Sequence, residues 1–144
     1  MTTVDYPPCQ QLCRVWSNNS SGVIQFNSPK RLTEDLSNNP YLAVSGNQRI
    51  RKLGGGAVIT VAGNGFQSNS GDGSLATLSS LNNPRDVCID SVGNLFIADN
   101  GNFRVREVAA GTESISTVAG VMANPTAVAL DMYNIVHVAE TGNH

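Results

Sequence analysis

The residues that could bind a metal ion or take part in catalysis are few and scattered. The two histidines, His137 and His144, lie seven positions apart near the end of the sequence. A catalytic zinc site takes three protein ligands, and the sequence offers no third histidine. Asp72, in a Gly-Asp-Gly loop, would need several more oxygen ligands at defined spacing to hold calcium. We therefore expect no metal ion or other cofactor, and we interpret Asp72 as part of a structural loop.

The cysteines and serines show no catalytic pattern. Cys9 and Cys13 are compatible with a disulfide in an exported protein or with half of a metal site, and the spacing leaves both open. Cys88 falls in an apolar run, so we expect a small buried residue. The sequence contains no Gly-x-Ser-x-Gly motif, no paired histidine motif and no phosphate-binding glycine loop. These features favour a protein that is not an enzyme.

The charges argue against a nucleic acid partner, and the apolar runs are too short for a membrane span. The net charge is −2 and 14% of the residues are charged, whereas phosphate recognition depends on clustered Lys and Arg. Arg49 and Arg51 alternate along the chain, as do Arg104 and Arg106. Residues at this spacing share one face of a strand, so we expect them to pair with carboxylates such as Asp99. No apolar run approaches the ~18 residues of a membrane span.

Residues 83–120 contain the elements that would position these side chains. Four short apolar runs lie in this stretch: Val87–Ile89, Leu95–Ala98, Phe103–Val108 and Ile115–Ala119. Residues that favour turns, mainly Asp, Asn and Gly, separate the runs. The pattern predicts a four-stranded antiparallel meander.

The same pattern recurs on both sides of this stretch. A shift of 55 positions upstream superimposes Pro84 on Pro29 and Asp90 on Asp35, and a shift of 41 positions downstream superimposes Asp90 on Asp131. A period near 41 residues with four short strands per unit is typical of a propeller blade. We therefore predict successive blades rather than one globular sheet.

The repeated residues resemble the NHL repeat. The resemblance rests on Asn-Pro, an apolar triplet ending in Asp, then GNLFIADNGNFRVR and ISTVAG at fixed spacing. It implies an all-β fold, a partial β-propeller made of four-stranded antiparallel blades. Since the chain has 144 residues and propellers close with at least ~4 blades, we expect a propeller that is not closed within this chain, and a fragment of a longer repeat protein.

The predicted organisation has six parts. They are a disordered lead-in at 1–11, the second half of a blade at 12–26, a first repeat at 27–63, an inserted loop at 64–81, a second repeat at 82–120 and a truncated third repeat at 121–144. Pro40 is disfavoured inside a strand, so the second strand of the first repeat should begin at Tyr41. His137 matches Phe96, which predicts a core or half-buried histidine.

The insertion at 64–81 is the part that does not repeat. Asp72 or Ser74 is predicted to cap a short helical turn that carries Leu75, Leu78 and Leu81 onto the neighbouring blade. Because repeated residues serve the blade itself, the unrepeated ones are better candidates for contacting a partner. The candidate interaction residues are Phe66, Asn69 and Asp72.

The resemblance to the NHL repeat is compatible with three alternative functions. We expect a non-enzymatic propeller segment that acts as a protein-interaction or sensing module. The alternatives are an RNA-binding NHL propeller, disfavoured by the missing basic patch, and a fragment of a zinc-dependent peptidyl-α-hydroxyglycine lyase-like enzyme, disfavoured by the two histidines. The unpaired blade edges also predict self-association.

Overall fold

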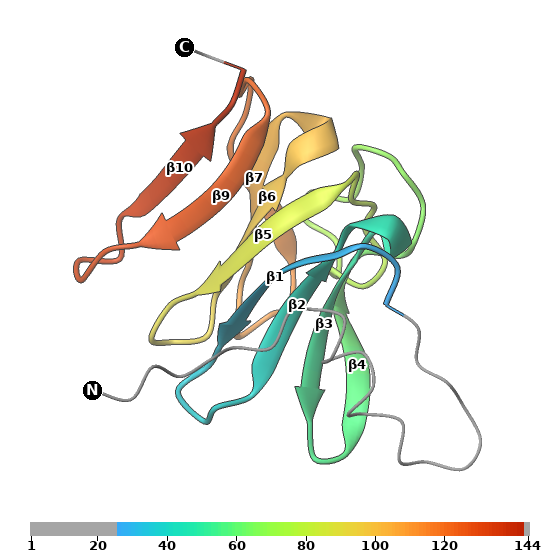
Figure 1. Cartoon of the computed structure of the whole chain (residues 1–144), viewed down its shortest axis with the longest axis vertical. Coiled ribbons are helices and arrows are strands. Elements are labelled where there is room, and N and C mark those ends of the chain that lie inside the picture. Colours follow the sequence, from blue (N-terminus) through green and yellow to red (C-terminus); the bar gives the residue numbers. More distant parts are fainter. Residues whose placement is uncertain (1–25, 143–144) are drawn as a thin grey trace.

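The structure is a computed structural model that describes residues 26–142. The described part contains ten strands and two 3-10 helices (Figure 1). They are β1 (Pro29–Glu34), β2 (Pro40–Val44), η1 (Ser45–Asn47), β3 (Arg49–Gly54), β4 (Ala57–Ala62), β5 (Pro84–Ile89), β6 (Leu95–Asp99), η2 (Asn100–Asn102), β7 (Arg104–Val108), β8 (Ile115–Ala119), β9 (Pro125–Leu130) and β10 (Val136–Glu140). Neither of these helical turns has the length or apolarity needed to cross a membrane.

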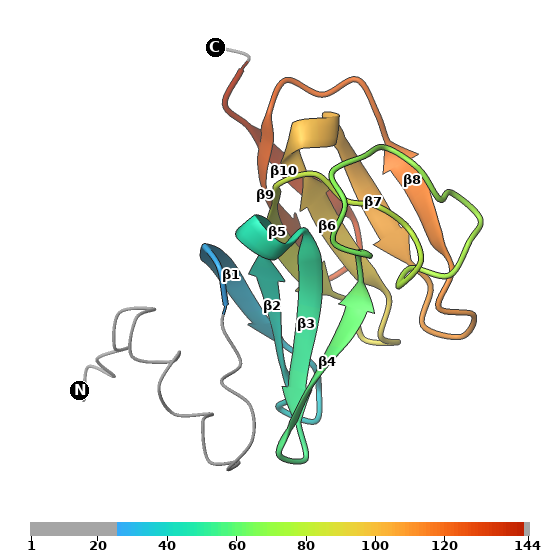
Figure 2. The ribbon, with the colours of Figure 1, turned by 90° about the vertical axis from the view of Figure 1, so that its right-hand side faces the viewer.

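The strands form three separate antiparallel units. The first sheet has the order β1-β2-β3-β4, the second has the order β5-β6-β7-β8, and β9 pairs with β10. The first strands of successive units, β1, β5 and β9, lie beside one another, and the units fan out from them without closing a ring (Figures 1 and 2). The all-β, unclosed arrangement of four-stranded blades is therefore confirmed.

Several predictions from the sequence fall outside residues 26–142. They are the lead-in at 1–11, nearly all of the half-blade at 12–26, the pairing of Cys9 with Cys13, and the surroundings of His144. One predicted boundary was wrong, because β2 begins at Pro40, which pairs with Glu34. The first residue of a strand is a position where the missing N–H of proline is tolerated.

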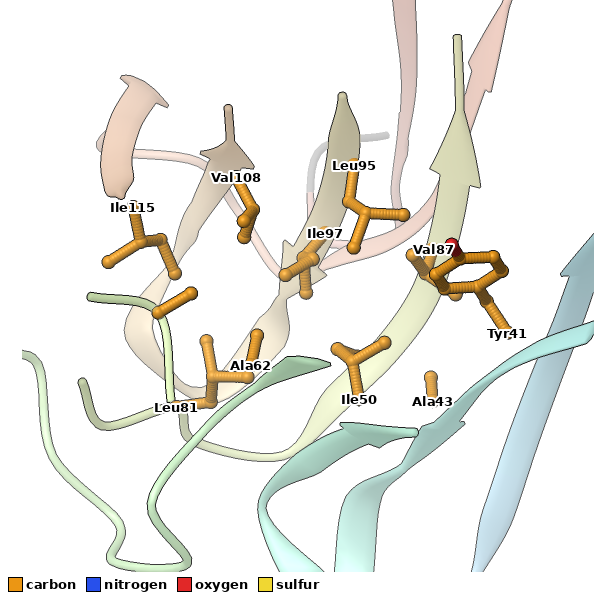
Figure 3. Close-up of a cluster of buried hydrophobic side chains, with 11 residues drawn as sticks. Tyr41, Ala43, Ile50, Ala62, Leu81, Val87, Leu95, Ile97, Val108 and Ile115 are labelled. Atoms are coloured by element: carbon orange, nitrogen blue, oxygen red, sulfur yellow. The ribbon is translucent and has the colours of Figure 1, made fainter. Parts of the chain in front are cut away.

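The core lies between successive sheets rather than inside one of them (Figure 3). Its buried members come from both sheets and from the intervening segment: Tyr41, Ala43, Ile50, Ala62, Ala76, Leu81, Val87, Leu95, Ile97, Val108 and Ile115. A second cluster, containing Phe96, Val105 and Val128, joins the second sheet to the β9–β10 hairpin. Burying a large apolar side chain contributes roughly 1.5–3 kcal/mol. No strand ladder links the sheets, so this packing is the main contact that holds them together.

The repeated aspartates shape the turn between the first two strands of each unit. Asp35, Asp90 and Asp131 each accept hydrogen bonds through Oδ1 from the backbone N–H groups two and four residues ahead. Such a turn needs a short side-chain acceptor at its first position. The register found by superimposing the repeats therefore reflects a local hydrogen-bonding requirement that recurs in all three units.

Candidate functional site

The insertion at 64–81 runs between the first and second sheets and is fastened by backbone hydrogen bonds. Ala76 N donates to Glu113 O at 2.8 Å, Ile115 N donates to Ser74 O at 2.9 Å, and Gly63 N donates to Ala76 O at 2.9 Å. Of its apolar side chains, Leu81 and Ala76 are buried in the core between the sheets. The insertion is thus an ordered part of the blade junction.

The predicted helical turn in this insertion is present only as a hydrogen-bonded turn, in which Leu78 N donates to Leu75 O at 3.0 Å and Ser79 N donates to Ala76 O at 3.3 Å. Residues 64–81 contain turns and isolated bridges but no helix. Gly71 and Gly73, which precede the turn, have φ of +97° and +81°, values that a right-handed helix does not allow, and Ala76 N donates to Glu113 O of another segment. Three leucines were expected to pack against the neighbouring blade, but Leu75 and Leu78 are exposed.

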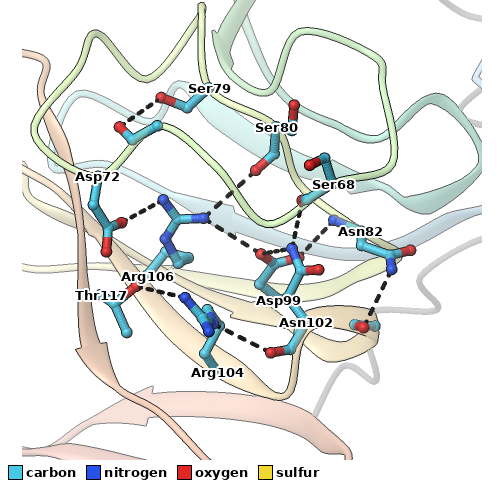
Figure 4. A network of polar contacts seen from close by, with 12 residues as sticks. Ser68, Asp72, Ser79, Ser80, Asn82, Asp99, Asn102, Arg104, Arg106 and Thr117 are labelled. Atoms are coloured by element: carbon cyan, nitrogen blue, oxygen red, sulfur yellow. Dashed lines mark hydrogen bonds and ion pairs between the residues drawn. The ribbon is translucent and has the colours of Figure 1, made fainter.

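A buried arginine clamps the insertion to the second sheet (Figure 4). Arg106 on β7 places Nη2 2.6 Å from Asp72 Oδ1 of the insertion, and Nη1 3.6 Å from Asp99 Oδ2 of β6. Its Nη1 also donates to Ser80 O at 3.5 Å. The side chain of Arg106 is buried, as is that of Asp99, whereas that of Asp72 is 50% exposed. We call these three residues the clamp.

Further hydrogen bonds surround the clamp. Asp99 Oδ1 accepts from Asn82 N at 2.7 Å, and Asp99 Oδ2 accepts from Asn102 Nδ2 at 2.7 Å. Asn102 Nδ2 also donates to Ser68 O of the insertion at 2.7 Å. Burial raises the pKa of Asp99 above its usual range, while these donors and the nearby arginine oppose the rise. A buried carboxylate needs such partners to remain ionised.

The expected pairing of strand arginines with carboxylates is therefore confirmed for Arg106. Its neighbour Arg104 instead donates to Asn102 O at 3.2 Å and to Thr117 Oγ1 at 3.3 Å. In the first sheet, Arg49 donates to two backbone oxygens, and Arg51, the counterpart of Arg106, donates to the Thr60 hydroxyl. These bonds join strands or loops without a carboxylate.

The three candidate interaction residues have different surroundings. Phe66 is exposed, and its backbone N–H donates to Asn64 Oδ1. Asn69 is exposed and lines a shallow groove beside the second sheet. Asp72 is held by Arg106, so half of its carboxylate surface is already covered. The structure thus brings Asn69 to a surface hollow, leaves Phe66 in solvent and commits Asp72 to the clamp.

The groove has a volume of about 570 Å³. It is lined by Asn69, Asn102, Phe103, Arg104, Val121, Met122 and Ala123. Phe103 follows η2, while Val121 and Met122 belong to the link between β8 and β9. We call this hollow the loop groove. Its rim combines amide, guanidinium and apolar surface.

Two apolar residues of the loop groove have a strained backbone. Phe103 has φ of +56° and is 50% exposed, and Val121 has φ of +59° and is fully exposed. Positive φ is uncommon for bulky residues and costs on the order of 1–3 kcal/mol. A solvent-exposed loop with no further role would favour Gly or Asn at such positions. The sequence analysis missed both residues, although an aromatic directly after a Gly-Asn turn was a visible signal.

His137 does not lie in a core. Its side chain is 62% exposed, and Nε2 lies 3.1 Å from Asp131 Oδ2. The prediction of a core or half-buried histidine was therefore wrong. Phe96, the counterpart of His137 in the second sheet, is covered by the β9–β10 hairpin, whereas no further unit covers β10 within residues 26–142. Across those residues, no group of three His, Cys, Asp or Glu side chains is placed to hold a metal ion.

Comparison with known proteins supports the repeat assignment. The sequence profile of the NHL repeat matches residues 81–107, which cover the first three strands of the second sheet apart from the final residue of β7. A search of curated proteins found no match. The resemblance seen in the repeated residues is therefore confirmed for the second repeat.

Solved structures show the same fold at low sequence identity. A protein of unknown function from Bacteroides thetaiotaomicron is 20% identical, with a TM-score of 0.66 over 83% of this chain and 34% of that chain. An auxiliary nutrient binding protein from the same organism is 13% identical, with a TM-score of 0.63 over 78% of this chain and 35% of that one. Virginiamycin B lyase from Staphylococcus aureus is 10% identical, with a TM-score of 0.60 over 81% of this chain and 36% of that one. The chain thus spans about a third of the length of these structures.

Proposed function

We propose that this chain, which carries an NHL repeat within a partial β-propeller, is a non-enzymatic protein-interaction module that binds its partner at the loop groove. The observation that carries the proposal is the pair of strained, exposed apolar residues, Phe103 and Val121, on one hollow. Backbone strain at exposed positions gathers where function requires a particular side chain. The partner we expect is a protein segment with an apolar side chain that fills the groove.

The fold alone does not decide between binding and catalysis. Structures similar to this chain include a nutrient binding protein and a lyase, and one fold commonly hosts both kinds of function. The argument for binding comes from the groove itself. Asn69 and Arg104 place an amide and a guanidinium group beside the apolar residues of the groove, a composition typical of interaction surfaces, where aromatic residues and arginine are enriched.

The first repeat supplies a matched variant for the test. Gln48 occupies the position of Phe103, with φ of +54°, and its Oε1 accepts a hydrogen bond from Asn83 N at 2.6 Å. Phe103→Gln therefore introduces a residue that the same backbone already accommodates. Tyr133→Gln is the control, because Tyr133 is an exposed aromatic in the β9–β10 turn and does not line the groove.

The experiment selects peptides from a random displayed library on the wild-type chain and then measures their dissociation constants. Fully burying an aromatic side chain contributes about 1.5–3 kcal/mol. Phe103 is half exposed, so its loss should weaken binding about tenfold. We expect this loss for Phe103→Gln and no change for Tyr133→Gln. Peptides that bind both variants equally well would show that the groove is not the binding site.

RNA binding is the second candidate, because an aromatic residue and an arginine lie side by side in the groove. Phe103 and Arg104 are the residue types on which single-stranded bases stack. Titration of the chain with a single-stranded oligoribonucleotide tests this candidate. Tight binding that weakens steeply with salt and is lost in Phe103→Gln would favour RNA over a protein segment.

A further inference from the structure

A second hollow lies between the first and second sheets, separate from the loop groove. It has a volume of about 450 Å³, within the range of roughly 300–1,000 Å³ that small-molecule sites occupy. None of its lining residues lines the loop groove. Asp35 and Gly93, from the first turns of the two sheets, both line it. We call this hollow the inter-sheet cleft.

The floor of the inter-sheet cleft is apolar. It includes Val61 from β4, Ile89 from β5, Leu95 from β6 and Val108 from β7. Leu95 and Val108 lie at the end of the inter-sheet core away from Ala62 and Leu81 (Figure 3). A hydrocarbon chain placed against these side chains would be removed from water, which is favourable for each methylene group buried.

One wall of the cleft carries a cation that is already paired. Lys52 Nζ lies 3.2 Å from Asp35 Oδ2 and 5.0 Å from the centroid of the Tyr41 ring. Tyr41 Oη also lies 3.4 Å from Asp35 Oδ2. The charges of Lys52 and Asp35 therefore balance each other. An anionic ligand would have to compete with Asp35 for Lys52.

The remaining charged residue that lines the cleft is Glu113. This side chain is exposed and makes no hydrogen bond or ion pair within residues 26–142. Its backbone is fixed, because Glu113 N donates to Ala109 O and Glu113 O accepts from Ala76 N, both at 2.8 Å. Glu113 has φ of +54° in the β7–β8 turn at 109–114, which is longer than the Gly55–Gly56 turn between β3 and β4. A carboxylate thus stands at a strained position where a glycine would be easier to accommodate.

We propose that the inter-sheet cleft binds an organic monocation, an ammonium or guanidinium group on an apolar stem. The cation lies at Glu113, and the stem lies on Leu95 and Val108. With Lys52 and Asp35 neutralising each other, the cleft carries one net negative charge. This binding site is independent of the loop groove and of any protein partner there.

The experiment uses three probes with the same six-carbon stem: hexylammonium, hexanol and hexanoate. Binding to the whole chain is followed by NMR through the methyl signals of Leu95 and Val108. An exposed ion pair contributes up to about 1 kcal/mol, so hexylammonium should bind up to about fivefold more tightly than hexanol. Hexanoate should bind no more tightly than hexanol. Equal affinities for hexylammonium and hexanol, or shifts that do not saturate, would overturn the proposal.

Three variants separate the charge from the cavity. Glu113→Gln should remove the preference for hexylammonium and leave hexanol binding unchanged. Glu107→Gln removes the same charge from β7, one residue before Val108 and hence on the opposite face of the strand, so the preference should persist. Thr77→Trp places a large side chain at an exposed lining position and should abolish binding of all probes. A preference that survives in Glu113→Gln, or probe shifts that persist in Thr77→Trp, would refute the assigned site.

Discussion

Replacing Arg106 with methionine tests whether the clamp holds the insertion in place. Methionine keeps an unbranched apolar stem but removes the guanidinium group, which contacts Asp99 at 3.6 Å and Asp72 at 2.6 Å. Asp72 is half exposed, and water can replace its lost partner. Asp99 is buried in the fold, so its charge would lose its ion-pair partner and keep only the weaker attraction of Arg104. The consequence of the substitution should therefore come mainly from Asp99.

The size of the effect follows from what Asp99 retains. Removing one partner of a buried ion pair costs about 3–5 kcal/mol. Asp99 keeps two donors at 2.7 Å, from Asn82 N and Asn102 Nδ2, which places the expected loss near the lower end, at about 3 kcal/mol. Asp72→Asn is the matched control, since it breaks only the half-exposed contact and should cost at most about 1 kcal/mol.

The assay is urea unfolding of the whole chain followed by far-UV circular dichroism. With a slope of about 2 kcal/mol per molar urea, Arg106→Met should lower the midpoint by about 1.5 M. Burial raises the pKa of Asp99 in the folded protein. A raised pKa means that protonation favours the folded state, so the defect should be largest at neutral pH and should shrink as the pH falls through the folded pKa.

A second substitution decides between charge and packing. If the unpaired Asp99 carboxylate causes the loss, adding Asp99→Asn to Arg106→Met should recover part of the stability, because asparagine carries no charge. Further destabilisation in the double variant would refute this explanation. The explanation would also be refuted if Arg106→Met lowered the free energy of unfolding by no more than Asp72→Asn does.

Two further predictions concern titrating groups. Hydrogen bonds from the Asn39 side chain hold the pKa of Asp35 well below its usual range. Its contribution to stability should thus be complete above pH ~4, the unfolded value, and should decrease steadily as the pH falls from there toward the lowered folded pKa. Asp35→Asn should therefore destabilise the protein most in urea unfolding at pH 7, and the loss should be only partly reduced at pH 2.5, where Asp35 is still mainly ionised in the folded protein. Burial raises the pKa of Cys88 to about 12, so the folded chain carries little of the reactive thiolate at pH 8.5. In a Cys9→Ser, Cys13→Ser background, iodoacetamide should therefore label Cys88 on the order of 100-fold more slowly in the folded chain than in the urea-unfolded chain. Mass spectrometry measures the two labelling rates.

The strands were predictable because local and repeated signals agree. Alternating apolar residues, turn-forming residues and the superimposed repeats all place strands at the same positions, and the second sheet follows them closely. The aspartate that begins each first turn recurs because its side chain caps that turn. Requirements of this kind are local, so they can be seen in the sequence.

The insertion was harder to predict because its conformation depends on distant partners. The spacing of Leu75, Leu78 and Leu81 suggested one face of a helix. The backbone forms one hydrogen-bonded turn at 75–79 and otherwise pairs with Glu113 in the β7–β8 turn and with Ile115 of β8. Those contacts join residues far apart in the chain, and they outweigh the weak helical preference of a Gly-rich and Ser-rich segment.

The environment of a strand residue depends on what lies beside its sheet. His137 and Phe96 occupy equivalent positions, and the register predicted this correctly. Phe96 is buried against the β9–β10 hairpin, whereas His137 faces solvent and contacts Asp131. A repeat pattern thus predicts which way a side chain points but not what covers it.

The loop groove lies where one repeat departs from another at the same backbone position. Gln48 and Phe103 share a left-handed backbone, but Gln48 bonds to Asn83 N and joins two units, while Phe103 presents an aromatic ring to the loop groove. Since this backbone satisfies the requirements of the blade in both repeats, the blade does not require the aromatic ring. Glu113 also has a positive φ, but in the β7–β8 turn at 109–114, which is longer than the Gly55–Gly56 turn of the first sheet. An exposed side chain at a strained position without a role in the fold is what the proposed binding sites account for.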